Sequence, residues 1–146
     1  MTEFNIRPAK PSDAKALGAV IDAAYRPYLT AGLTLPAVSE GLEQAICDLT
    51  AWVAVQDARV VGGLIADLDG QAHIVNLAVA PDAAGAGLGR ALLETAVSAA
   101  RRAGHQSIGL ATHVDMTSTQ AFYRKQGWVE TARERDKIHF ALRLCD

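Results

Sequence analysis

Three glycines alternate with other residues in one short stretch, soon after an apolar run. The run covers residues 74–79, and the glycines are Gly85, Gly87 and Gly89. Glycine adopts a positive φ without strain, and no side chain holds a ligand away from its backbone N–H group. The amphipathic pattern that begins at Leu88 predicts a helix, whose first N–H groups have no partner within the helix. A strand, loop and helix in this order form a site for an anion, phosphate above all.

Two familiar phosphate-binding motifs do not fit the stretch. A P-loop requires a lysine directly after its last glycine, and no lysine follows any of these glycines. A dinucleotide fingerprint, G-x-G-x-x-G, fails because its last position falls on Arg90 or Leu92, depending on the first glycine chosen. A glycine-rich turn before an ordinary helix is the alternative that remains.

A second motif follows further along the chain, at residues 116–128. It reads Met-Thr-Ser-Thr-Gln-Ala-Phe-Tyr-Arg-Lys-Gln-Gly-Trp, so that Tyr123 precedes Gly127 and Trp128. The first motif reads Val79-x-Pro81-x-x-x-Gly85-x-Gly87-x-Gly89-x-x-Leu92. In type, order and separation the two motifs resemble the coenzyme A loop and the later tyrosine helix of the GNAT acetyltransferase superfamily. The resemblance covers residues 74–130 well and the rest of the chain in outline.

Periodicity along the chain agrees with that outline. Strands are predicted at residues 4–7, 52–55, 59–68, 71–79, 107–111, 129–135 and 138–144. Helices are predicted from a cap at Ser12-Asp13 to Pro27, and over residues 39–48, 88–104 and 117–126, with a loop from Pro27 to Pro36. The resemblance implies one mixed α/β domain over residues 1–146. Its sheet would be mostly antiparallel, with six to seven strands, one splayed strand pair and about four flanking helices.

The resemblance also implies which residues bind acetyl-coenzyme A. Backbone amides of the loop and the first helical turn would hold the diphosphate, and the strand before the loop would pair with the pantetheine arm. The residues concerned are Leu77, Ala78, Val79, Ala84, Gly85, Ala86, Gly87, Leu88, Gly89, Arg90 and Tyr123. Position 84 departs from the family, which usually has Arg or Gln there. We therefore expect weaker coenzyme A binding rather than its loss.

Transfer of an acetyl group to an amine needs a proton acceptor for the amine and a proton donor for the leaving thiolate. The resemblance assigns the donor role to Tyr123, whose phenol stays protonated at neutral pH. His73 is the first candidate acceptor, because a strand period of two places it on one face with Val75, Leu77 and Val79. His113, just after the strand at residues 107–111, is the second candidate, and water alone is the third. The alternative for Tyr123 is a core aromatic residue.

Composition excludes several classes of function. The chain has 146 residues and a net charge of −2, without a basic block, which argues against nucleic acid as the partner. No apolar run reaches the ~20 residues of a membrane span, and the N-terminus lacks the pattern of a signal peptide. Cys47 and Cys145 are too few for a disulfide framework, and no Cys/His cluster has metal-ligand spacing. A cytoplasmic protein without a metal site is expected.

The sequence therefore predicts a GNAT-type N-acetyltransferase, in which an amine attacks acetyl-coenzyme A directly. The alternative is a sensor or partner module of the same fold that binds acyl-coenzyme A without turnover, and Ala84 favours it. The acceptor is expected to be a primary amine of a small molecule or peptide, bound between residues 23–48 and 129–144. Tyr25, Tyr28, Glu40 and Glu43 would form an aromatic, acidic wall, or would simply cover the sheet and face water. The oligomeric state stays open, a homodimer included.

Overall fold

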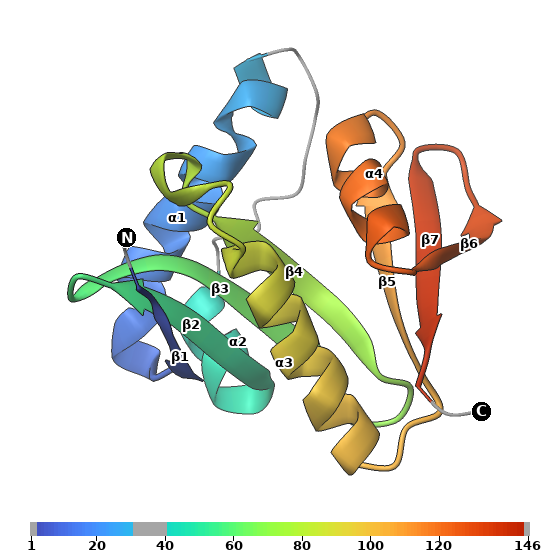
Figure 1. Ribbon diagram of the computed structural model, residues 1–146, viewed down its shortest axis with the longest axis horizontal. Helices are drawn as coiled ribbons and strands as arrows, with labels where there is room; N and C mark the ends of the chain where they lie inside the picture. Colours follow the sequence, from blue (N-terminus) through green and yellow to red (C-terminus); the bar gives the residue numbers. More distant parts are fainter. Residues whose placement is uncertain (1–2, 31–40, 145–146) are drawn as a thin grey trace.

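One seven-stranded sheet organises the protein (Figure 1). The computed structural model describes residues 3–30 and 41–144. The strands are β1 (Asn5–Pro8), β2 (Thr50–Gln56), β3 (Arg59–Asp67), β4 (His73–Val79), β5 (Ser107–His113), β6 (Val129–Arg133) and β7 (Lys137–Arg143). The helices in this part of the chain are α1 (Ala14–Thr30), α2 (Leu42–Asp48), α3 (Leu88–Arg102) and α4 (Thr117–Lys125), with short 3₁₀ turns η1 (Pro11–Asp13) and η2 (Pro81–Ala83). This architecture confirms the predicted mixed α/β fold.

The strands lie in the order β1-β2-β3-β4-β5-β7-β6, and every neighbouring pair except β4 and β5 is antiparallel. Tight turns explain why consecutive strands pair. Asp57 and Ala58, between β2 and β3, both have positive φ. A two-residue type I′ hairpin turn requires positive φ at both of its central residues. Between β3 and β4, the N–H of Asp69 donates to Asp67 Oδ1 at 3.0 Å and Gly70 has φ +64°. The predicted hairpin at Asp69-Gly70 is confirmed.

Two adjacent glycines of β3 show which helices cover which face. A Cβ added to Gly62 would lie 3.3 Å from Leu92 of α3, and one added to Gly63 would lie 2.4 Å from Leu17 of α1. Because successive strand residues point to opposite faces, α3 and α1 cover opposite sides of the sheet. We call these the α3 face and the α1 face. In Figure 1 α3 and α4 lie in front of the sheet and α1 lies behind it.

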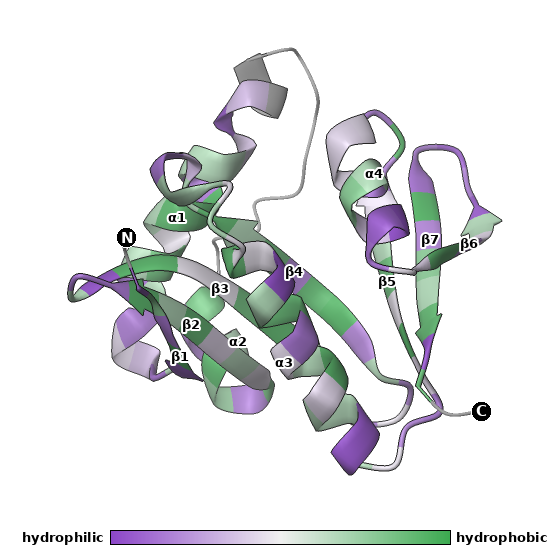
Figure 2. Ribbon diagram, in the orientation of Figure 1, coloured by the Kyte–Doolittle hydropathy of each residue, from purple (hydrophilic) through white to green (hydrophobic). Residues whose placement is uncertain are grey.

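The core lies on both faces of the central strands. Val53, Leu64, Leu92 and Ile108 are fully buried, and the strands that contribute to the core are mostly apolar (Figure 2). The turn between β6 and β7 is hydrophilic in the same view. Burial of such side chains on two sides of one sheet provides the main stabilisation of a layered domain.

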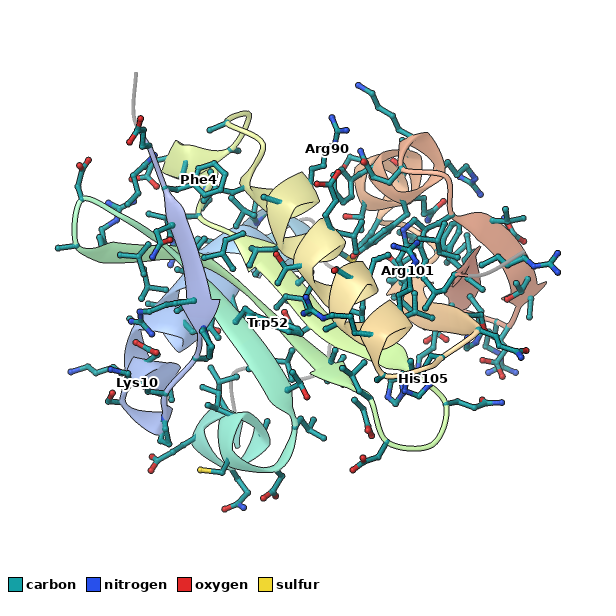
Figure 3. The ribbon with its side chains drawn as sticks, turned by 60° about the horizontal axis from the view of Figure 1, so that its bottom comes forward. Phe4, Lys10, Trp52, Arg90, Arg101 and His105 are labelled. Atoms are coloured by element: carbon teal, nitrogen blue, oxygen red, sulfur yellow. The ribbon has the colours of Figure 1, made fainter. Side chains whose placement is uncertain are left out.

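Strands β4 and β5 separate after a single point of pairing. His73 pairs with Gly109, whose N–H donates to Ala72 O at 3.0 Å, and no further pair joins the two strands. The closed end is reinforced by His105, whose Nε2 lies 2.7 Å from Leu68 O, next to the β3–β4 turn (Figure 3). Beyond it the two strands diverge, which confirms the predicted splayed pair.

A β-bulge at Val75 reverses the face of the sheet to which the side chains of β4 point before and after it. Ile65 pairs with Asn76 whereas Ala66 pairs with Ile74, so Val75 has no residue opposite it on β3. On one side of the bulge Gly62 pairs with Val79, and on the other Asp67 pairs with His73. Residues directly opposite each other share a face. Val79 and Leu77 therefore lie on the α3 face and His73 on the α1 face, so the prediction that they share a face is wrong.

Two predicted helix boundaries also differ from the structure. Helix α1 continues through Pro27 to Thr30 instead of ending at Pro27. Pro27 is exposed, so the one backbone hydrogen bond that proline cannot make is lost on the solvent side. Helix α2 begins at Leu42 after Gly41, which has φ +69°, and not at residue 39. The remainder of the predicted loop, residues 31–36, and Ser39 lie outside the described residues.

Candidate active site

The glycine loop joins the end of β4 to α3. Gly85 and Gly87 have φ of +87° and +85°, a region that L side chains rarely adopt, and a Cβ at either would meet no atom within 4 Å. These glycines are thus required by the backbone conformation and not by crowding. Gly89 is different, because its Cβ would lie 3.6 Å from Phe122 of α4 and 3.7 Å from Val79. The first turn of α3 is therefore packed against both the end of β4 and α4.

The loop presents a run of free backbone N–H groups. Within the described part of the chain, no N–H from Gly85 to Arg90 donates a hydrogen bond, whereas that of Ala91 donates to Gly87 O at 3.0 Å. The N-cap, Gly87, offers no side chain to cap the helix. Six donors at the positive end of a 15-residue helix are thus available to an anionic ligand. This arrangement fits the diphosphate of coenzyme A.

No cation is free beside that loop among the described residues around it. Position 84 is alanine, Arg90 binds Glu94 at 3.0 Å, and Arg59 binds Asp82 through two hydrogen bonds of 2.8 and 2.9 Å. Figure 3 shows Arg90 on the first turn of α3. The electrostatic attraction for phosphate therefore comes mainly from the backbone amides and the helix dipole.

A cavity of about 700 Å³ occupies the opening between β4 and β5. It is lined from the α3 face by Leu77, Val79, Thr112 and Tyr123, among others, and it reaches Tyr25 of α1 on the opposite face. The cavity therefore passes through the sheet, because the splay leaves no backbone ladder to close it. Two ligands could meet in it from opposite sides.

The register of β4 decides which main-chain groups face the cavity. The N–H of Ala80 donates to Val61 O at 2.8 Å, so these opposed residues form a hydrogen-bonded pair. In an antiparallel ladder such pairs alternate with pairs that do not bond. The N–H and C=O groups of Leu77 and Val79 thus point toward the splay, whereas those of Ala78 point toward β3. Of the three predicted residues, therefore, Leu77 and Val79 have backbone groups available on the side of the splay, and Ala78 does not.

Tyr123 lines the cavity from α4. Its side chain is 6% exposed, and its ring lies in edge contact with Phe122 and Trp128, at centroid distances of 5.3 and 5.8 Å. Burial, with a smaller contribution from the nearby Tyr25, raises the pKa of Tyr123 well above the ordinary value for a phenol. The hydroxyl therefore stays protonated at neutral pH.

The structure separates the two candidate histidines. His113 lines the cavity that contains Tyr123, and its Nδ1 accepts the N–H of Asp115 at 3.1 Å. With Nδ1 as acceptor, the neutral ring carries its proton on Nε2. His73 does not line that cavity. It is exposed at the closed end of the splay, where its Nδ1 lies 3.2 Å from Gln71 O.

Sequence reasoning missed several residues of the cavity. Asp136 and Lys137 reach it from the start of β7, and Asp136 is the only carboxylate among its described lining residues. The other carboxylates of the β6–β7 hairpin are paired, Glu130 with Arg124 and Arg133 and Glu134 with His139. No local pattern marks Asp136, because a hairpin register brings it to the cavity.

Thr112 is another residue that the sequence did not single out. It lies on β5 and lines the cavity, and its Oγ1 is buried without a hydrogen-bond partner in the described structure. A buried hydroxyl without a partner costs about 1–3 kcal/mol. Such an atom beside a cavity is consistent with a polar ligand group that completes the site.

The proposed aromatic and acidic wall is present only in part. Tyr25 lines the cavity, but Glu43, on the exposed side of α2, does not. The side chain of Tyr28 and all of Glu40 lie outside the described residues. None of the helices that the structure describes is both long enough and apolar enough to cross a membrane.

Comparisons with known proteins agree with this geometry. A family model, the acetyltransferase (GNAT) family, matches residues 19–128. A comparison with curated proteins finds no match. Among solved structures, PaiA N-acetyltransferase from Thermoplasma acidophilum, in complex with coenzyme A, superimposes with a TM-score of 0.87 at 18% identity, over 97% of this chain and 99% of that one.

Two further solved structures are similar over nearly their whole length. The ribosomal-protein-S18-alanine N-acetyltransferase from Escherichia coli has a TM-score of 0.79 at 20% identity, covering 99% of this chain and 96% of that one. An acetyltransferase from Thermus thermophilus has a TM-score of 0.79 at 24% identity, covering 97% of each. These structures share the fold, and the family model covers most of the sequence. The chain belongs to the acetyltransferase (GNAT) family.

Proposed function

We propose that this protein transfers an acetyl group from acetyl-coenzyme A to a primary amine by direct attack. The observation that carries the proposal is the cavity through the splayed sheet, which has a donor-rich loop at the end of β4 and a buried tyrosine on its wall. Acetyl-coenzyme A supplies an activated thioester when bound. The free N–H groups from Gly85 to Arg90 would hold its diphosphate. The free N–H and C=O groups of Leu77 and Val79 would form hydrogen bonds with its pantetheine arm.

Tyr123 is the proposed proton donor. As the thioester carbon–sulfur bond breaks, the phenol O–H gives its proton to the departing thiolate. Burial supports this role in one respect, because the raised pKa keeps the phenol protonated at neutral pH, so the O–H is present when the thiolate forms beside it. The aromatic contacts on Tyr123 support it too, since they hold the ring in one position.

His113 is the better placed of the two histidines to accept the proton of the amine. It shares the cavity with Tyr123, whereas His73 lies outside it. To take up a proton at Nδ1, the ring gives up the hydrogen bond from Asp115 N–H. The Asp115 carboxylate, 3.8 Å from Nδ1, then stabilises the resulting cation. A water molecule in the cavity is the alternative acceptor.

The acceptor would enter from the α1 face, between α1 and the β6–β7 hairpin. Tyr25 of α1 and Asp136 at the start of the hairpin support this route, since both line the cavity and they combine aromatic surface with negative charge. Both features attract an ammonium group. The amine of a small molecule or a peptide fits this description.

Release of free coenzyme A tests the proposal. Acetyl-coenzyme A is incubated with the protein and a panel of amines, amino acids and peptides, and thiol formation is followed. Amine-dependent release that falls in Tyr123→Phe supports the transferase. The alternative, a sensor or partner module without turnover, is supported by tight coenzyme A binding with no release for any acceptor. Ala84 is the feature that favours this alternative.

A further inference from the structure

A second hollow adjoins the active-site cavity on the α1 face. This groove has a volume of about 890 Å³ and shares Ile74, Val75, Leu110 and Ala111 with the cavity. The groove and the cavity therefore adjoin at these four residues. The groove then runs toward the closed end of the splay, where it reaches His73 and Ser107.

Small side chains form the floor of the groove. Gly109 pairs with Ala141, and Ala111 pairs with His139, so these four residues share one face of β5 and β7. His73, the partner of Gly109 on β4, lies on the same face. No residue of the four described helices lines the groove. The small side chains at Gly109, Ala111 and Ala141 let the backbone of a ligand approach the sheet closely there.

The lining of the groove carries no Asp, Glu, Lys or Arg among its described residues. Its polar groups are amides, hydroxyls and imidazoles, contributed by Gln71, His73, His105, Gln106, Ser107, Thr131 and His139, whose Nε2 lies 2.6 Å from a carboxylate oxygen of Glu134. Such groups pair with the N–H and C=O groups of a neutral main chain. A ligand with several cationic groups would find no carboxylate in this lining.

Exposed apolar surface gathers on the same face. Val75 and Val129 are the large hydrophobic side chains that the described structure leaves exposed, at 49% and 64%. Val75 lines the groove, and Val129 pairs with Ala141 of its floor. A partner with alternating side chains could cover both valines, as an extended segment does when it lies on a sheet.

We infer that the acceptor is a peptide whose reacting amine lies in the Tyr123 cavity and whose following residues lie extended along this groove. The inference rests on the proposed function. A free amino acid or small amine would leave the groove unused, and a polycation would find no carboxylate in it. A peptide matches both parts, because its charged end meets Asp136 and its neutral main chain meets the amides, hydroxyls and imidazoles of the lining.

Conjugates of coenzyme A and peptides test this inference by binding alone. Peptides of one to five residues are joined through their N-terminal amine and an acetyl bridge to the coenzyme A sulfur, and affinity is measured by calorimetry. We expect affinity to rise roughly tenfold or more from one residue to five, since each tenfold requires only about 1.4 kcal/mol of added contact. Equal affinity at every length would overturn the inference.

Ala141→Phe supplies the matching variant, because it fills the floor of the groove with a side chain that suits a strand. The gain with length should disappear in this variant, while the one-residue conjugate binds as it does to the wild type. Ala19→Phe, on the exposed side of α1, is the control and should keep the full gain. Retention of the gain in a folded Ala141→Phe protein would also refute the inference. If coenzyme A itself does not bind, the proposed function fails and this inference with it.

Discussion

The ring of Tyr123 packs against the indole of Trp128, with centroids 5.8 Å apart and planes inclined by 60°. Phe140 lies 6.3 Å away on another side, and Phe122 lies 5.3 Å away. The aromatic contacts fix the ring but do not involve proton transfer. The hydroxyl can therefore be removed with little change in packing, which separates a catalytic role from a structural one.

Tyr123→Phe should reduce turnover by about 10²-fold or more, the usual contribution of a general acid. The melting temperature should stay close to that of the wild type, because the ring and its neighbours remain. Steady-state kinetics with an accepted amine and a thermal melt provide the two measurements. A turnover number equal to that of the wild type would leave Tyr123 as a core residue only.

Gly87→Val should abolish most coenzyme A affinity. The fold requires a φ of +85° at this position, which valine avoids, so the substitution costs about 1–2 kcal/mol of stability. The new side chain would also lie beside the free amides and hinder the ligand. Calorimetry with coenzyme A measures the effect. Gly41→Val is the control, since Gly41 also has a positive φ and open space but caps α2 instead of α3. Equal losses of affinity in both variants would point to general destabilisation.

Ala84→Arg should strengthen coenzyme A binding at low salt. The arginines described near the loop are engaged with carboxylates, so a new guanidinium would add the side-chain charge that position 84 lacks. The gain should shrink as ionic strength rises, because exposed charges are screened. The measurement is the coenzyme A affinity of Ala84→Arg and of the wild type at two salt concentrations. Equal affinities at low salt would show that a charged side chain at position 84 adds nothing to the backbone amides.

His113→Gln and His73→Gln test the assignment of the proton acceptor. We expect His113→Gln to lower kcat/KM by roughly 10²-fold, within the usual range for a general base, and His73→Gln to leave it unchanged for an acceptor too short to reach the groove. A full pH–rate profile of each variant is the measurement. Normal activity in His113→Gln would assign the role to water.

The titration of the Asp13 carboxylate should make the stability of the protein depend on pH in the acid range. Its carboxylate is 10% exposed and accepts two hydrogen bonds from Arg7, at 2.8 and 3.0 Å, and one from Lys10 N–H at 2.7 Å. The Arg7 hydrogen bond above all lowers the pKa of Asp13. The stabilisation is thus complete above the pKa of an unfolded aspartate, near ~3.9, and is lost as pH falls through the lower pKa of the folded state.

The corresponding variant is Asp13→Asn, which should lower the unfolding free energy at pH 7 by about 2 kcal/mol, the range for hydrogen bonds to a charged group. The difference from the wild type should narrow as the pH falls below ~4. Denaturant unfolding at several pH values measures it. Asp22→Asn, at an exposed position on α1, should show no such dependence. A constant difference between the Asp13 variant and the wild type would contradict the explanation.

Apart from the fold and its splayed strand pair, which the family resemblance implied, the features that the sequence predicted correctly are local. The Asp69-Gly70 hairpin and the strand–loop–helix around Gly87 depend on neighbouring residues, so their sequence carries the signal. His73 was assigned to the wrong face because one extra residue at Val75 reverses a period of two, and a bulge has no sequence signature here. Asp136 was missed because its place in the cavity depends on strand pairing across the whole domain.

The single pairing between β4 and β5 also has a mechanical consequence. Strands β1 to β4 form one hydrogen-bonded group and strands β5, β7 and β6 another. Among the described residues, His73 and Gly109 form the only strand pair between the two groups. Force or heat that separates the two groups of strands therefore has few backbone hydrogen bonds to break between β4 and β5. A ligand that forms hydrogen bonds with both β4 and β5 would join the two groups of strands. The free protein and its complex should therefore differ most in the cooperativity with which the two groups unfold.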